Sequence, residues 1–83
     1  MNKVLITVYV PLLDEKFDLF IPINKKIGTI KNILINSILE LSNNSVSDVS
    51  NLKLYEKNTC KLLENNVYVN SSGIINGSSL ILL

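Results

Sequence analysis

The chain has 83 residues, of which 47% are hydrophobic and 18% charged, and its formal net charge is +1 at pH 7. This length allows one domain with a single core, so we expect residues 1–83 to form one domain. The basic residues are eight scattered lysines with no arginine, so no basic stripe is available to follow phosphates and nucleic-acid binding is not expected.

Two stretches of alternating hydrophobic residues open the chain. Every second residue in 3–10 is valine or isoleucine, and residues 16–23 repeat the alternation. A period of two is typical of strands that bury one face. Pro11 ends the first strand, and the short connection that follows predicts an antiparallel hairpin. Pro22 indicates that the second strand lies at a sheet edge, because proline has no N–H to donate.

Residues 30–41, IKNILINSILEL, carry hydrophobic residues at helical spacing. Ile33 lies at the margin of the stripe that is expected to face the sheet, which consists of Ile30, Leu34, Ile38 and Leu41. Thr29 is the expected N-cap, since its hydroxyl can accept a hydrogen bond from the first turn. Residues 42–44 are expected to end the helix.

The second half of the chain is predicted to hold three more strands, at residues 52–55, 60–63 and 80–83. Lys57–Thr59 is the expected turn between the first two. Asn76–Gly77 is a strong turn signal before the last strand. Residues 65–75 are expected to be irregular and to reach the core through Val67, Val69 and either Ile74 or Ile75.

The order of these elements is strand, strand, helix, strand, short strand, strand. It predicts an α+β fold of the β-grasp type, in which a mixed five-stranded sheet packs one face on a single helix. The last strand is expected to pair with the first in parallel, because the long intervening chain permits such a crossover.

The residues offer little reaction chemistry. No histidine is present, which removes the usual general base, the common nucleophile pairs and most zinc sites. Cys60 is the single cysteine, as is typical of the reducing cytoplasm. No stretch is long enough to span a bilayer. We therefore expect a cytoplasmic protein that is not an enzyme, with no catalytic residues, no cofactor and no metal.

The order and spacing of apolar positions resemble ubiquitin-like proteins over nearly the full length, with Thr29–Ile30 opening the helix. Within that superfamily, LKLYEK, KLLENN and IINGSSLILL in residues 52–83 are similar to the final strands of the YukD/EsaB-type proteins. These belong to type VII secretion loci of low-GC Gram-positive bacteria. The resemblance implies a non-enzymatic adaptor that binds a protein partner, such as a cytoplasmic domain of a membrane component of the secretion system.

Two departures from the resemblance matter. Conjugated ubiquitin-like proteins and sulfur carriers end in a flexible Gly-Gly tail, whereas the sequence given ends Leu80–Leu83 with its three glycines internal. Conjugation is therefore not expected. Lys53 stands where ubiquitin has the central isoleucine of its recognition patch, so ubiquitin receptors are not expected to bind. Two alternatives stay open: a carrier that is processed or extended at its C-terminus, and a ubiquitin-like domain excised from a larger membrane protein.

Two surfaces are candidates for partner binding. Alternation places six hydrophobic residues on the open face of the sheet, around Lys53, where neighbouring strands can merge them into a patch: Leu5, Tyr9, Phe20, Tyr55, Ile81 and Leu83. Helical geometry turns Ile35 and Leu39 away from the buried stripe and places them side by side. They form a possible helix-face docking site, unless the connection at residues 45–51 covers them.

Overall fold

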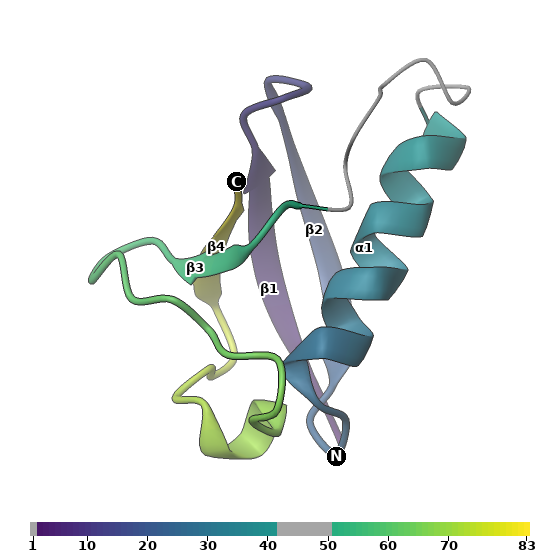
Figure 1. Ribbon diagram of the computed structural model, residues 1–83. Coiled ribbons are helices and arrows are strands. Elements are labelled where there is room, and N and C mark those ends of the chain that lie inside the picture. The colour runs from purple at the N-terminus through teal and green to yellow at the C-terminus, as the bar shows by residue number, and fades with distance from the viewer. Residues whose placement is uncertain (1, 42–50) are drawn as a thin grey trace.

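The structure is a computed structural model that describes residues 2–41 and 51–83. Helix α1 lies along one face of a sheet, and the long connection after β3 crosses the end of the sheet near the N-terminus (Figure 1). The elements follow the predicted order, with a short 3₁₀ helix before the last strand: β1 (Lys3–Val10), β2 (Glu15–Pro22), α1 (Ile27–Leu41), β3 (Leu54–Glu56), the 3₁₀ helix (Val69–Ser71) and β4 (Ser78–Leu82).

The sheet is mixed, with strand order β2-β1-β4-β3. β1 pairs antiparallel with β2 from Lys3↔Pro22 to Val10↔Glu15. β4 pairs in parallel with β1 and antiparallel with β3, so the predicted parallel closure of the sheet is confirmed. β2 lies at an edge of this order, as Pro22 indicated.

The predicted strand at residues 60–63 is wrong, and the described sheet has four strands instead of five. In this stretch the chain makes a single bridge, Leu62 with Tyr55. Cys60 has a φ of 58°, which is left-handed and incompatible with a strand. It turns the chain before a ladder can extend. Leu63 is nevertheless buried, so the hydrophobic residues here anchor a loop to the core.

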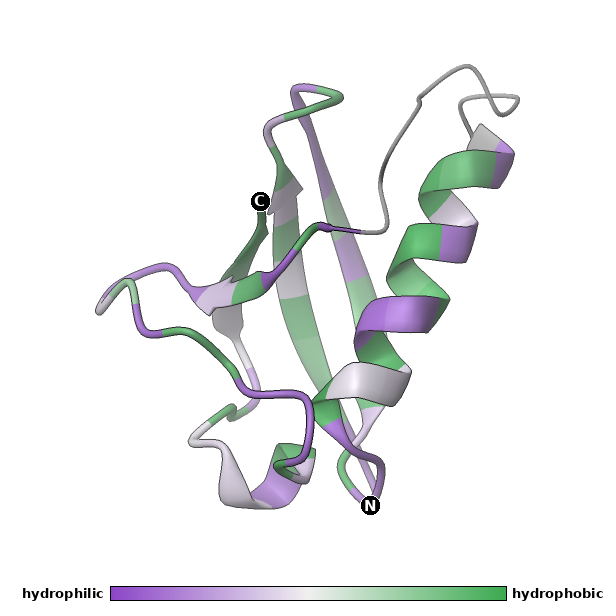
Figure 2. Cartoon of the chain, viewed as in Figure 1, coloured by the Kyte–Doolittle hydropathy of each residue, from purple (hydrophilic) through white to green (hydrophobic). Residues whose placement is uncertain are grey.

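The helix stripe is confirmed for Ile30, Leu34 and Ile38, which are buried, and it extends back to Ile27. Ile33 is 50% exposed. Polar and apolar residues alternate along α1 in Figure 2, as expected for a helix with one buried side. The predicted helix stop at residues 42–44 and the side chain of Leu41 lie outside the described part of the chain.

The sheet and the loops complete a core that is wholly hydrophobic among the described residues. Its sheet members are the buried side chains of Ile6, Val8, Val10, Ile21, Leu54, Leu80 and Leu82. Val69 and Ile74 reach it from the irregular region, while Val67 is half-buried. Ile75 is 68% exposed, so Ile74 is the anchor of the pair that the sequence left undecided.

The expected N-cap at Thr29 is wrong, because α1 already begins at Ile27. The first N–H groups are satisfied by backbone carbonyls of a distant loop. Ile27 N donates to Val67 O at 2.8 Å, and Gly28 N donates to Asn65 O at 3.1 Å. The helix start is therefore set by tertiary contact with the loop, where a side-chain cap would otherwise be needed.

The Asn76–Gly77 turn joins the end of the irregular region to β4 and is present as predicted. Gly77 has a φ of +91°, a conformation that side chains rarely adopt. Its N–H donates to Leu5 O at 2.7 Å, and Asn76 Oδ1 accepts from Leu5 N at 2.7 Å. The turn therefore positions β4 directly beside β1.

Candidate partner-binding surface

The strand register brings four open-face side chains into one row across the sheet. Tyr9 of β1 is paired with Lys16 of β2 and with Ile81 of β4, and Ile81 is paired with Tyr55 of β3. Side chains directly opposite each other on neighbouring strands are in contact range. Leu83 follows Ile81 by two residues, is 61% exposed and belongs to the same side. We call Tyr9, Tyr55, Ile81 and Leu83 the open-face strip.

One end of the open-face strip is hollowed. The hollow has a volume of about 320 Å³ and is lined by Tyr55, Glu56, Cys60, Ile81 and Leu83. Its walls are therefore mainly apolar, and Glu56 contributes the one carboxylate among them. Sequence reasoning missed Glu56 and Cys60, because β3 extends to Glu56 and because Cys60 reaches the hollow from a turn where a strand was predicted. Cys60 is exposed, and its thiol lies 4.0 Å from Lys57 O.

Lys53 lies next to the strip and is exposed. Its backbone exchanges two hydrogen bonds with Leu83, Lys53 N to Leu83 O and Leu83 N to Lys53 O, both at 2.8 Å. These bonds hold Leu83 in line with β3 although it follows the last residue of β4. Lys53 thus adds a positive charge to the rim of the strip.

A polar row separates the strip from the other open-face hydrophobic residues. Thr7 is paired with Asp18 on one side and Ser79 on the other, and its hydroxyl donates to Asp18 Oδ1 at 2.6 Å. Leu5 and Phe20 lie opposite each other beyond this row. The six hydrophobic residues therefore form two areas, and the single merged patch that alternation allowed does not form.

The second area contains Leu5 and Phe20. Phe20 is 56% exposed and Leu5 is 37% exposed. The N–H and the C=O of Leu5 are both hydrogen-bonded to the Asn76–Gly77 turn, which holds the backbone of this small area in place.

The helix-face candidate differs from the expectation. Ile35 is half-buried and packs against the core, and Leu39 is also half-buried. At 3.6 residues per turn, Ile35 lies roughly 95° from the centre of the buried stripe, at its flank. Ile33, on the other flank, is the more exposed helix residue. In the open-face strip, Tyr9, Tyr55 and Ile81 are half-buried like Ile35 and Leu39, and Leu83 is exposed.

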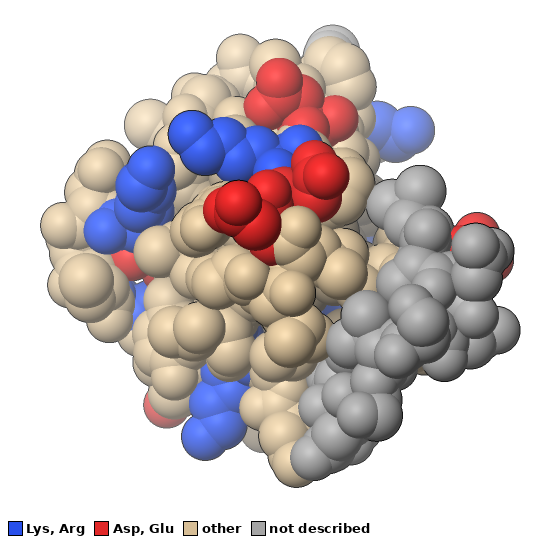
Figure 3. Space-filling view, turned by 90° about the horizontal axis from the view of Figure 1, so that it is seen from above, with Lys and Arg blue, Asp and Glu red and all other residues tan. Residues whose placement is uncertain are grey.

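Charges at the end of the molecule that carries the β1–β2 turn are of both signs. Figure 3 shows acidic and basic side chains side by side there, with no field of one sign. Asp14, in this turn, has a φ of 51° and accepts a hydrogen bond from the Tyr9 hydroxyl at 3.1 Å. The turn therefore borders the strip and fixes the orientation of one of its aromatic rings.

The contact with Asp14 raises the pKa of Tyr9 above the ordinary value of 10.0, first through the hydrogen bond, then through desolvation and the negative charge of Asp14. Only the neutral phenol can donate this bond. Its contribution to stability is therefore present below pH 10 and is lost as the pH rises through the raised pKa of the folded state.

Asp14→Asn is expected to lower the pKa of Tyr9, because it removes the negative charge while asparagine tolerates the left-handed turn. The measurement is an ultraviolet absorbance titration of phenolate formation. Tyr55→Phe and Tyr68→Phe in the background leave Tyr9 as the one tyrosine that titrates. An identical titration curve with and without Asp14→Asn would show that the contact does not persist in solution.

Two other kinds of feature are absent from the described ranges. No three histidine, cysteine, aspartate or glutamate side chains in residues 2–41 and 51–83 come together as a possible metal site. No helix there is long and apolar enough to cross a membrane.

Comparison with known proteins gives matches in structure but not in sequence. No protein-family model matches the chain, and the search of curated proteins finds no match either. Among solved structures, a ubiquitin-like domain from Arabidopsis thaliana is similar over the whole chain and 78% of that domain's chain, with a TM-score of 0.70 and 18% identity.

Two further solved structures are similar over the whole of this chain. The ubiquitin-like domain of the Mycobacterium tuberculosis type VII secretion protein ECCD1 aligns over 100% of this chain and 99% of that one, with a TM-score of 0.72 and 16% identity. A chain of the ESX-5 inner membrane complex gives a TM-score of 0.80 at 9% identity. The present chain spans about a fifth (21%) of that chain's length. The chain therefore has a ubiquitin-like β-grasp fold, shared with the ubiquitin-like domain of a type VII secretion protein.

Proposed function

We propose that the chain is a non-enzymatic protein-binding domain of a type VII secretion system of the YukD/EsaB kind, located in the cytoplasm, and that it binds through the open-face strip without conjugation. The observation that carries the proposal is the match to the ECCD1 ubiquitin-like domain over nearly the whole of both chains. The absence of a histidine from the sequence supports a binding role over an enzymatic one.

The strip has the properties of a docking surface. Its side chains come from three neighbouring strands with fixed register, so little conformational entropy is lost when a partner binds. Tyrosine is enriched among residues that dominate binding energy, and the strip contains two. The hollow beside Tyr55 and Leu83 can receive an apolar side chain of the partner.

The ESX-5 comparison favours a second form of the same function. There the similar region is one part of a much longer chain in a membrane complex. The present sequence can accordingly be a domain within a larger membrane component, where the strip would contact neighbouring subunits. Both forms require the same surface, and intact-mass measurement of the protein from its own organism separates them.

Tyr55→Lys is expected to abolish partner binding, since it places a charge within the strip, beside the hollow. The fold should stay intact, because Tyr55 is half-buried and is not a member of the buried core. The protein is tagged at its N-terminus, away from the strip, and cross-linked in the organism from which the gene comes. Wild type should capture a component of the secretion system, and the captured chain should carry no isopeptide adduct.

Ile33→Lys is the matched control, because Ile33 is exposed on the helix, on the other side of the sheet from the strip. It should capture the same component as wild type, and thermal unfolding should show that both variants are folded. Equal capture by Tyr55→Lys would exclude the strip as the binding surface. Capture of no secretion component by wild type would argue against the proposed function itself.

A further inference from the structure

β2 presents an unpaired backbone edge within the described structure. β2 lies at the end of the strand order. Ile23, just after β2, directs its backbone toward the β1 side, because Ile23 N donates to Asn2 O at 2.9 Å. Because alternate residues of an antiparallel strand face the partner, the odd-numbered residues of β2 direct their backbone groups toward β1. Lys16, Asp18 and Phe20 therefore direct theirs outward, while Pro22 offers a carbonyl alone. Such an edge accepts an added strand.

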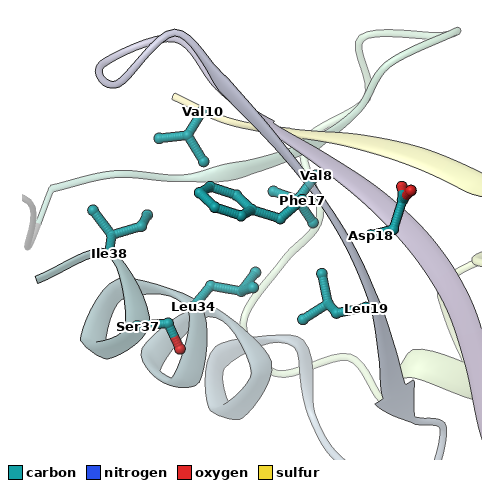
Figure 4. Close-up of a pocket in the computed structure, with 8 residues that line it drawn as sticks. All are labelled: Val8, Val10, Phe17, Asp18, Leu19, Leu34, Ser37 and Ile38. Atoms are coloured by element: carbon teal, nitrogen blue, oxygen red, sulfur yellow. The ribbon is translucent and has the colours of Figure 1, made fainter. Parts of the chain in front are cut away.

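An apolar hollow of about 200 Å³ lies between this edge and α1. Phe17 and Leu19 of β2 form one wall, Leu34 and Ile38 of α1 form the other, and Val8 and Val10 lie behind them (Figure 4). Phe17 and Leu19 are half-buried, in contrast to the buried side chains around them. A strand added to β2 would direct every second side chain over this hollow.

The open side of the same edge carries opposite charges. Lys16 and Asp18 are both exposed and flank Phe17. An added strand must therefore be apolar on the helix side, with an anion opposite Lys16 and a cation opposite Asp18, because opposite charges across strands stabilise a pair and like charges destabilise it. β2 itself, read in the reverse direction, meets all three requirements.

We propose that β2 binds β2 of a second copy of this chain, antiparallel about a two-fold axis at Phe17. Phe17 then lies opposite Phe17 of the second copy, and Lys16 lies opposite Asp18 on both sides of the axis. Lys16 and Asp18 both have outward backbone groups, so each Lys16–Asp18 pair exchanges two hydrogen bonds. The two sheets become one continuous sheet.

Neighbouring registers are less favourable. Moving the two-fold axis from residue 17 to residue 18 sets Asp18 against Asp18. Moving it to residue 16 sets Lys16 against Lys16. Each places like charges directly opposite. A register centred on Leu19 sets Lys16 against Pro22, which has no N–H to donate. The charges of β2 therefore select one register. This interface uses the sheet edge and does not depend on the proposed binding function of the open-face strip.

A charge exchange tests the interface. Sedimentation equilibrium of wild type should show the mass rising from 9.3 kDa toward twice that value between micromolar and millimolar concentrations. Lys16→Asp alone should remain monomeric over this range, and adding Asp18→Lys should restore dimerisation. Both positions are exposed, and thermal unfolding confirms that the variants are folded. A monomeric wild type, or a Lys16→Asp variant that dimerises like wild type, would overturn the proposal.

Cysteine cross-linking tests the register in a Cys60→Ser background. Phe17→Cys should form a disulfide-linked dimer under mild oxidation, because a non-hydrogen-bonded pair has a Cα separation of about 4.5 Å, within disulfide range. Leu19→Cys is the control. In the proposed register two copies of residue 19 are roughly 13 Å apart along the strands, so little cross-linking is expected. Cross-linking of Leu19→Cys above that of Phe17→Cys would overturn the register.

Discussion

Ile30→Asp is expected to abolish the cooperative unfolding transition of this protein. Ile30 is 1% exposed and belongs to the hydrophobic core cluster, and no described buried side chain is polar or charged. A carboxylate at this point has no partner, so it either costs several kcal/mol or folds only in its neutral form. Domains of this kind have about 5–15 kcal/mol of stability in total. Urea unfolding followed by circular dichroism measures the loss.

Ile33→Asp is the matched control, because it makes the same change three residues further along the same helix. Ile33 is 50% exposed, so the carboxylate stays hydrated. The free energy of unfolding should therefore fall by less than about 1 kcal/mol. If Ile30→Asp and Ile33→Asp lowered the free energy of unfolding equally, aspartate would act through its low helix propensity and not through burial. An unchanged transition in Ile30→Asp would remove Ile30 from the core.

Gly28→Val is expected to lower the unfolding midpoint by roughly 5–20 °C, corresponding to about 1–3 kcal/mol. A Cβ at Gly28 would lie 3.2 Å from Asn65 Cβ and 3.3 Å from Asn65 O. The added side chain pushes this loop away from the helix. The bonds from Gly28 N to Asn65 O and from Ile27 N to Val67 O then weaken, and the helix start loses its partners.

Thr29→Val separates the two accounts of how the helix begins. If Thr29 were the N-cap, losing its hydroxyl would cost about 1 kcal/mol. In the structure Thr29 is exposed inside the first turn. The free energy of unfolding should therefore change by no more than about 0.5 kcal/mol. Differential scanning calorimetry of both variants makes the comparison. A larger loss for Thr29→Val than for Gly28→Val would contradict the loop-based helix start.

The division of the open face limits what a partner can contact. The Thr7–Asp18 hydrogen bond and Ser79 place a polar row between the strip and the Leu5–Phe20 pair. A partner that covers both areas must satisfy these polar groups or leave them hydrated, because burying them unpaired is costly. A partner that contacts the strip alone avoids this desolvation cost. The partner is therefore expected to bind nearer β3 and β4 than β2.

Features that depend on the burial of one face were predictable from the sequence. The alternation in residues 3–10 and 16–23 predicted β1 and β2, and the stripe through Ile30, Leu34 and Ile38 predicted α1. Pro22 predicted the sheet edge, and Asn76–Gly77 the last turn. Each of these signals is local, because the period of the hydrophobic residues reports directly which face of an element is buried.

Features that depend on contact between distant segments were decided by the tertiary structure. The start of α1 depends on carbonyls at Asn65 and Val67, which no local pattern connects to Ile27. Cys60 adopts a left-handed conformation that ends pairing where the sequence favoured a strand. The division of the open face depends on the register that sets Thr7 beside Ser79. Hydrophobic periodicity specifies a face for each residue but not its neighbour on the next strand, because that neighbour is chosen by the packing of the whole sheet.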